Sequence, residues 1–136
     1  MEIKTGFFKE REIITGINQT TTFLWEGENV FSTPSMISEM EETCRLLLKE
    51  HFLTDPDWDS VGTVVNVKHL AATPIGTPVK FKSIVKEVNG RKVLFEVSAH
   101  DKKDKIGEGM HERFVINIPK FRIKFQDKQN ELKKIN

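Results

Sequence analysis

At 136 residues the chain is long enough for one domain with its own hydrophobic core. Its 21 basic and 20 acidic side chains nearly cancel, so no net field favours nucleic acid or an anionic membrane as a partner. Cys44 is the only cysteine, which excludes an intramolecular disulfide and a cysteine-based zinc site. We therefore expect a single domain over residues 1–136, with no nucleic-acid partner, no membrane partner and no bound metal.

The first residues, Met1 to Gly6, contain no apolar signal-peptide core, and no stretch has the length and apolarity of a membrane span. We expect a cytoplasmic protein. The first thirty residues mix short apolar groups with polar ones, which predicts a strand or two joined by loops.

The clearest helix begins at Thr33–Pro34. Threonine at the N-cap accepts hydrogen bonds from free backbone amides, and proline at the first helical position loses no needed donor. Six apolar residues then recur at helical spacing and form one stripe: Met36, Ile37, Met40, Cys44, Leu47 and Leu48. The pattern predicts one long helix that ends near Glu50 or His51 and forms the central packing element.

The sequence after Ser60 is typical of a β-sheet. Residues 61–67 are rich in β-branched side chains, while residues 79–85 and 93–99 alternate apolar with polar side chains. Between the last two segments, Asn89–Gly90 predicts a tight hairpin whose two turn positions need positive φ. One long helix followed by antiparallel strands predicts an α+β protein in which the sheet wraps the helix, the hot-dog fold.

The end of the chain is predicted to hold one more long strand, over about 107–118. Gly107 and Gly109 within it indicate a bulge or a close backbone approach rather than a nucleotide-binding loop. The polar residues 126–136 are expected to fray or to form a short surface helix.

Glu41 lies at the rim of the apolar stripe, within about 40° of Ile37 and Leu48 at 100° per residue. One interpretation is a surface ion pair with Arg45, four residues on; the other is a partly desolvated carboxylate beside a cleft. Thr33 lies a little over two turns earlier. It is either a plain helix cap or a hydroxyl beside the positive potential of the helix start.

His69 ends an apolar strand and enters a loop rich in threonine, proline and glycine, a frequent place for functional side chains. A surface histidine is the alternative. His51 at the helix end fits a structural role that offsets the helix dipole. No pair of the four histidines has the spacing of a metal site, and no phosphate-binding glycine loop or nucleophile elbow is present.

Two motifs closely resemble the fluoroacetyl-CoA-type thioesterases: HLAATPIG at His69–Gly76 and IGEGMHER at Ile106–Arg113. The segment Asn89–Asp101 between them fits the same pattern without gaps, and the resemblance extends over about Phe31–Phe121. It implies a hot-dog fold and hydrolysis of an acyl-CoA thioester to the free acid and CoA, with no cofactor besides that substrate. It also implies a homodimer, or a tetramer built from dimers, with sites at the subunit boundary.

The resemblance selects five site residues. Thr33, Glu41 and His69 match the family's catalytic threonine, glutamate and histidine, and Gly62 and Arg113 match substrate-binding positions. On this basis His69 is expected to be the general base for water, and Glu41 either orients that water or attacks the carbonyl carbon. Thr33 would hold the carboxylate or the substrate. The amide of Gly62 would donate to the oxyanion, while Arg113 would pair with a carboxylate or contact the acyl end.

Two departures from the family concern specificity. Residues 23–29 are shorter than the family's aromatic lid segment, and the polar Glu42 follows Glu41. The resemblance therefore implies a short-chain acyl-CoA thioesterase without implying selection of a fluorinated acyl group. A non-catalytic acyl-CoA-binding protein is the alternative, and a dehydratase-like activity is disfavoured by the Thr/Glu/His set.

Overall fold

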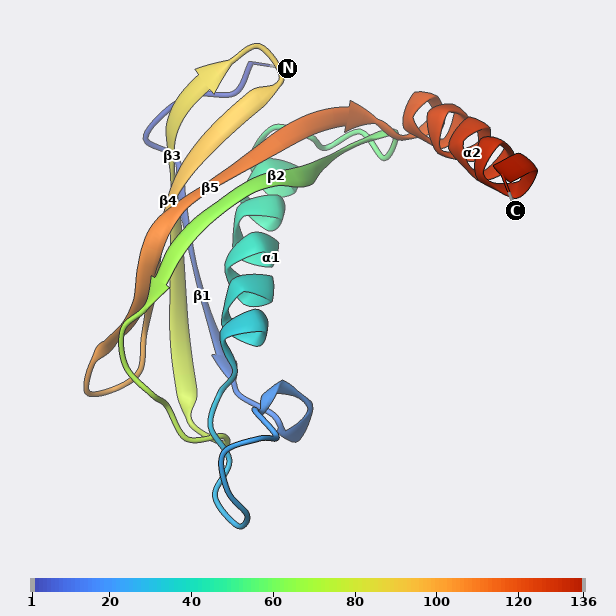
Figure 1. The fold of residues 1–136 in the computed structure, drawn as a ribbon. Coiled ribbons are helices and arrows are strands. Elements are labelled where there is room, and N and C mark those ends of the chain that lie inside the picture. The colour runs from blue at the N-terminus through green and yellow to red at the C-terminus, as the bar shows by residue number, and fades with distance from the viewer. Residues whose placement is uncertain (1, 136) are drawn as a thin grey trace.

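A computed structural model describes residues 2–135 (Figure 1). Its sheet has five antiparallel strands in the order β1-β3-β4-β5-β2. The strands are β1 (Phe8–Ile14), β2 (Trp58–His69), β3 (Pro78–Asn89), β4 (Lys92–His100) and β5 (Lys105–Asn117). Helix α1 (Thr33–His51) lies along one face of the curved sheet, joined to β1 through the short 3₁₀ helix η1 (Ile17–Gln19). The α+β arrangement expected from the sequence is confirmed.

The core lies between α1 and the sheet. Five residues of the predicted stripe are at most 2% exposed: Met36, Met40, Cys44, Leu47 and Leu48. They meet inward-facing residues of the central strands, including Phe81 of β3 and Phe95 of β4, which are fully buried. Burial of a side chain of this size contributes about 1.5–3 kcal/mol, so the stripe anchors α1 firmly and fixes which residues face outward.

The start of α1 differs from the prediction by one residue. Ser32 is the N-cap, since its Oγ accepts a hydrogen bond from the amide of Ser35 at 3.2 Å. Thr33 is therefore the first helical residue and Pro34 the second, so the prediction of a Thr33 cap is wrong. Serine and threonine cap equally well, and proline is tolerated throughout the first turn, so spacing alone did not separate the two positions. The correction leaves the hydroxyl of Thr33 free for another partner.

The β3–β4 hairpin is confirmed, but its turn is shifted by one residue. Asn89 pairs with Lys92, so the turn residues are Gly90 and Arg91, and only Gly90 has positive φ, 63°. Strand β2 also begins earlier than predicted, at Trp58, because Trp58 pairs with Asn117 of β5.

The carboxyl-terminal segment forms a second long helix, α2 (Ile118–Ile135), in place of the predicted short or frayed one. Asn117 starts it: its Oδ1 accepts a hydrogen bond from the amide of Lys120 at 3.2 Å, and Pro119 fits a first turn. None of the described residues of α2 is buried. Asn136 lies outside the described residues.

The close backbone approach predicted at Gly107 is confirmed. A Cβ atom on Gly107 would lie 2.5 Å from Sδ of Met36, so only glycine lets β5 approach α1 at this point. Among residues 2–135, neither long helix has the apolar length needed to cross a membrane.

Candidate functional site

Thr33 and His69 are in direct contact, although 36 residues separate them in the chain. Oγ1 of Thr33 and Nδ1 of His69 are 2.7 Å apart, a short hydrogen bond. The first turn of α1 presents the threonine, and the end of β2 presents the histidine. The amide of Leu70 donates to the carbonyl oxygen of Ile106 at 2.7 Å, which fixes the strand end that carries His69.

The environment of His69 favours its neutral form. Burial lowers the pKa of His69 below its ordinary value, and the nearby backbone of Ala71 opposes this shift in part. With Nδ1 bound to Thr33, the second ring nitrogen, Nε2, is buried without a hydrogen-bond partner among the described residues. In the tautomer in which Nδ1–H donates to Oγ1 of Thr33, Nε2 of the neutral imidazole has a free lone pair and can take a proton.

A hollow of about 360 Å³ opens beside this pair, and we call it the Thr33–His69 hollow. Its wall is mostly small or apolar and consists of Thr21, Leu24, Val30, Phe31, Ser32, Thr33, His69, Leu70, Ala71 and Ala72. The volume is at the lower end of small-molecule sites.

Glu41 belongs to a second cluster, two helical turns away. A Cβ atom placed on Gly62 would lie 3.6 Å from Oε1 of Glu41, 3.6 Å from Nη1 of Arg113 and 3.1 Å from Cε1 of His111. These three side chains therefore converge on the backbone of Gly62. The ion pair considered for Glu41 is absent among the described residues, because Arg45 binds Asp59 at 3.0 Å and Glu42 at 2.8 Å instead.

Arg113 is held rigidly in this second cluster. Arg113 is 5% exposed. Its Nε donates to Oγ of Ser60, and its Nη2 donates to the carbonyl oxygen of Ser60, both at 2.7 Å. Burial lowers the pKa of the guanidinium from its ordinary value, and the negative charge of Glu41 opposes that shift. An arginine remains charged at neutral pH, so Arg113 places a fixed positive charge near Glu41.

His111 is the third side chain of the second cluster, and the sequence does not predict a role for it. Its Nδ1 lies 2.8 Å from the carbonyl oxygen of Val64 and must donate to it. The neutral ring then has a lone pair on Nε2, which accepts from Nη1 of Arg113 at 3.2 Å. Burial, with a contribution from the charge of Arg113, lowers the pKa of His111, and the bond to Val64 opposes the shift. A signal was available: positions 111 and 113 share one face of a strand.

A bulge in β2 puts both clusters on the same face of the sheet. Gly62 and His69 are an odd number of residues apart, so in a regular strand they would face opposite sides. The pairing with β5 shifts by one residue between Gly62 and Val64, which turns both positions towards α1.

The five predicted residues therefore form two separate groups within one chain, and we call these groups half-sites. The structure joins Thr33 with His69, and Glu41 with Gly62 and Arg113. Eight helical residues separate Thr33 from Glu41, about 12 Å along the axis. That distance is too great for the five predicted residues to act on one thioester carbon within a single chain.

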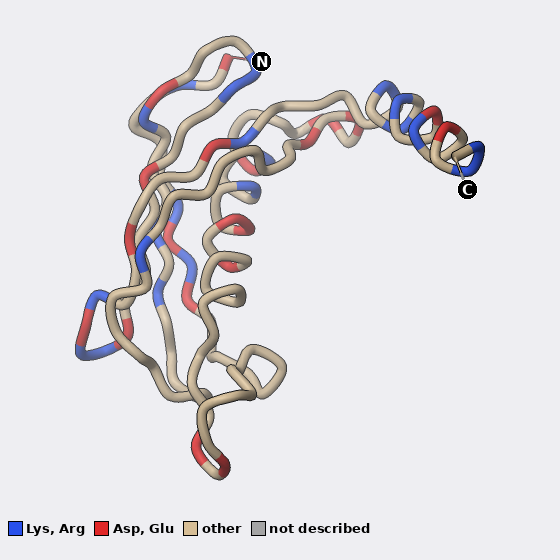
Figure 2. The backbone as a smooth tube through the Cα atoms, in the orientation of Figure 1, with Lys and Arg blue, Asp and Glu red and all other residues tan. Residues whose placement is uncertain are grey.

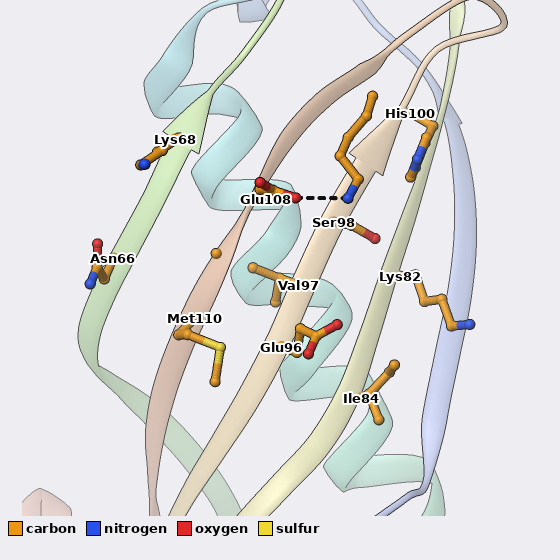
Figure 3. Close-up of a pocket in the computed structure, with 12 residues that line it drawn as sticks. Asn66, Lys68, Lys82, Ile84, Glu96, Val97, Ser98, His100, Glu108 and Met110 are labelled. Atoms are coloured by element: carbon orange, nitrogen blue, oxygen red, sulfur yellow. Dashed lines mark hydrogen bonds and ion pairs between the residues drawn. The ribbon is translucent and has the colours of Figure 1, made fainter.

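A larger hollow lies elsewhere, on the face of the sheet turned away from α1 (Figure 3). It measures about 600 Å³ and includes none of the five predicted residues. Charged side chains line much of it, among them Lys105 and Glu108, which form an ion pair at 2.7 Å. The smaller Thr33–His69 hollow, in contrast, is lined by two of the five predicted residues. Within residues 2–135, no group of three or more histidine, cysteine or acidic side chains is placed to hold a metal ion.

Comparison with known proteins adds independent information. The family model described as fluoroacetyl-CoA-specific thioesterase matches residues 16–119. A fluoroacetyl-CoA thioesterase of Streptantibioticus cattleyicolor is 40% identical over 103 residues, which cover 76% of this chain and 73% of the relative. A solved structure of the fluoroacetyl-CoA thioesterase FlK superposes with a TM-score of 0.84 at 32% identity, covering 94% of this chain and 98% of FlK. A Thermus thermophilus protein of the thioesterase superfamily, at 22% identity, covers 98% of each chain with a TM-score of 0.86 and supports the fold alone.

Proposed function

Because the chain belongs to the family of fluoroacetyl-CoA-specific thioesterases, we propose that it hydrolyses a short-chain acyl-CoA thioester to the free acid and CoA. The observation that carries this proposal is the 2.7 Å contact between Thr33 and His69 at the edge of a small hollow. A volume of about 360 Å³ with apolar walls accommodates a short acyl group and the thioester better than a long chain.

The two half-sites are completed by a second copy of the chain. Strand β2 is an edge of the sheet, and its mid-strand residues Val64 and Val65 are 49% and 40% exposed. The opposite edge, β1, is protected by a run of charged residues, Lys9 to Glu12. Antiparallel pairing of β2 with its own copy about Val64 and Val65 brings Gly62 of one protomer close to His69 of the other. Glu41 and Arg113 of one protomer then face Thr33 and His69 of its partner.

Hydrolysis proceeds through His69 as general base. The imidazole takes a proton from water, and the water oxygen adds to the thioester carbon. Collapse of the tetrahedral intermediate breaks the carbon–sulfur bond, and the CoA thiolate takes the proton back from the imidazolium. Thr33 fixes the ring orientation through Nδ1, and Glu41 of the partner orients the attacking water. Arg113, held by Ser60, stabilises the negative charge of Glu41 and of the oxyanion near Gly62.

Steady-state hydrolysis of acetyl-, malonyl-, butyryl- and longer acyl-CoA tests this function in the wild type and in Thr33→Ala, Glu41→Gln and His69→Ala. Removal of a general acid–base group lowers the rate by about a hundredfold or more, and His69→Ala is expected to show that loss. Circular dichroism of each variant serves as the control for folding. If all three folded variants remain within a few-fold of the wild type, the site assignment is wrong.

The same panel separates hydrolysis from binding alone. A chain that only binds acyl-CoA would gain thermal stability with CoA esters and release no thiol, because ligand binding to the folded state raises Tm without any reaction. Thermal stabilisation without turnover of any ester in the panel would replace the hydrolase assignment with that of a binding protein.

A further inference from the structure

Helix α2 exposes an apolar face that none of the described residues 2–135 covers. It projects away from the sheet beyond the start of β2 and the end of β5 (Figure 1). Its apolar residues recur at helical spacing and form one stripe. The stripe consists of Ile118, Phe121, Phe125 and Leu132, which are 39%, 44%, 55% and 50% exposed. Ile123, on the opposite face of the helix, is 60% exposed.

A second uncovered apolar patch lies on the loop before α1, residues 20–30, which we call the aromatic loop. Phe23, Leu24 and Trp25 at its tip are 81%, 50% and 57% exposed. Leu24 also lines the Thr33–His69 hollow, so this patch borders the candidate site. Neighbouring large apolar side chains left in solvent indicate an interaction surface.

The whole chain exposes more surface than a folded monomer of its size. Its accessible area is 8754 Å², whereas a compact 15.7 kDa protein exposes about 7,300 Å². The excess of roughly 1,500 Å² is about twice what one partner buries in a standard interface. The chain therefore has the area for extensive association with another molecule.

The two patches lie at opposite ends of the same edge strand. At one end of β2, the amide of Ile118 donates to the carbonyl oxygen of Asp57 at 2.7 Å, so α2 starts beside Trp58. At the other end, His69 contacts Thr33, next to the aromatic loop. Twelve strand residues separate these ends by about 36 Å. Both patches are on the α1 side of the sheet (Figure 1).

Antiparallel pairing of β2 with its copy places the start of β2 in one protomer beside the end of β2 in the other. The two-fold axis of such a pair is perpendicular to the sheet, so α2 of one protomer arrives on the α1 side of its partner, at the aromatic loop. At 18 residues α2 is about 27 Å long, enough to cross the loop and the mouth of the hollow.

The charges of the two patches are complementary (Figure 2). Helix α2 carries six basic residues and two acidic ones, whereas the aromatic loop carries Glu26 and Glu28. No lysine or arginine occurs between Arg11 and Arg45. A second copy of the chain thus supplies a partner that matches α2 in apolarity and in charge, which a neutral or basic surface does not.

We propose that the apolar stripe of α2 docks on the aromatic loop of a second copy and covers the partner's Thr33–His69 hollow. The docking rests on the edge-to-edge dimer in the proposed function, whereas acyl-CoA hydrolysis is not needed for it. Each protomer then contributes its α2 to the wall of the other protomer's site.

Disulfide trapping in the full-length protein tests the contact. Leu24→Cys combined with Phe125→Cys is expected to give a covalent dimer on mild oxidation, and the matched pair Leu24→Cys with Ile123→Cys is expected to lose it. The native Cys44 does not interfere, since it is buried and burial raises its pKa to about 12. Equal trapping in both pairs, or none, overturns the docking. Trapping by Phe125→Cys alone would mean that α2 pairs with α2 and would overturn it as well.

Tryptophan accessibility gives a second measurement without cysteine chemistry. Trp58→Phe leaves Trp25 as the only tryptophan. Acrylamide is expected to quench Trp25 weakly in this background and more strongly after Phe125→Lys, with no change after the control Ile123→Lys. Weakening of the dimer by about thirtyfold is expected for Phe125→Lys if Phe125 is a central aromatic anchor.

Sedimentation velocity and vesicle binding separate the ways in which the proposal can fail. A monomeric wild type overturns both the dimer and the docking. A dimer with a freely quenched Trp25 overturns the docking alone and leaves the proposed hydrolysis to its own assay. Binding of the wild type to phosphatidylglycerol vesicles, with Trp25 quenched freely in their absence, would assign the apolar stripe to a lipid surface instead.

Discussion

Replacing His111 by asparagine is expected to make the stability of the protein less sensitive to acid. His111 is 1% exposed, donates through Nδ1 to Val64 and accepts through Nε2 from Arg113. Protonation of Nε2 would set an N–H group against the guanidinium N–H at 3.2 Å and remove the acceptor. The folded state therefore resists protonation of this ring, in agreement with its lowered pKa.

The sign and size of the effect follow from linkage. When the pKa of a histidine is lower in the folded state, the unfolded state binds more protons, so stability falls as pH drops through the unfolded value of 6.5. A single histidine that remains neutral when folded lowers the free energy of unfolding by about 1.4 kcal/mol between pH 7.5 and pH 5.5. Asparagine retains a donor for Val64 but does not titrate, so this contribution disappears in His111→Asn.

Urea unfolding at several pH values from 7.5 to 5.5, at one protein concentration, measures the difference. His111→Asn is expected to be less stable at pH 7.5, because Arg113 loses its acceptor, and to lose about 1.4 kcal/mol less than the wild type on acidification. Since His69 titrates in both proteins, it cancels from the comparison. Parallel pH dependences of the two proteins would refute the neutral, arginine-bound state of His111.

Three other predictions concern the site and the core. The acid limb of kcat/KM is expected below pH 6.5, because burial lowers the pKa of His69 and catalysis requires its neutral form, and pH-rate profiles check this. Arg113→Lys should lower the free energy of unfolding by about 2–3 kcal/mol, since lysine lacks the fork that binds Ser60, as denaturant titration would show. Gly107→Ala should lower it by about 1–3 kcal/mol in the same assay, because the new methyl group would overlap Met36.

The central helix could be predicted because its signals are local. The apolar stripe from Met36 to Leu48 has the helical period over more than three turns, and five of its six residues are buried against the sheet. The predicted N-cap, Thr33, lies one residue after the observed N-cap, Ser32, because serine and threonine are about equally suited to that position. The predicted hairpin turn, Asn89–Gly90, lies one residue before the observed turn, Gly90–Arg91. Asparagine is common in turns, but here Asn89 pairs with Lys92 and is the last residue of the strand.

Helix α2 was underestimated because its sequence is polar and its apolar stripe is thin. Only a few large side chains recur at helical spacing after Ile118, and none is buried within the described chain. The polar composition therefore predicts a frayed end or a short surface helix. Asn117 is both the last residue of β5 and the N-cap of α2. Neither the alternation of a strand nor the periodicity of a helix indicates such a junction by itself.

Spacing alone left the role of each site residue open, and family resemblance selected them. Thr33 and His69 come from distant segments, and only the folded chain shows their 2.7 Å contact. The bulge between Gly62 and Val64 shifts the alternation of β2 by one residue. A simple odd–even count along the strand therefore assigns the residues after the bulge to the wrong face of the sheet. His111 was within reach of the sequence, since it alternates with Arg113 on a strand whose inward face is otherwise apolar.

Strand β2 is the element on which the proposed two-chain site depends. Gly62 and His69 belong to different half-sites of that strand, and α2 starts at the end opposite His69. An edge strand has open backbone donors and acceptors, so in the proposed dimer the pairing of β2 with its copy satisfies these groups and brings the half-sites of two chains together. In the proposed dimer, the distance of about 12 Å between Thr33 and Glu41 along α1 follows from symmetry, because each protomer presents complementary halves to its partner. The two-fold axis of that dimer would also direct the exposed apolar stripe of α2 towards the aromatic loop of the partner.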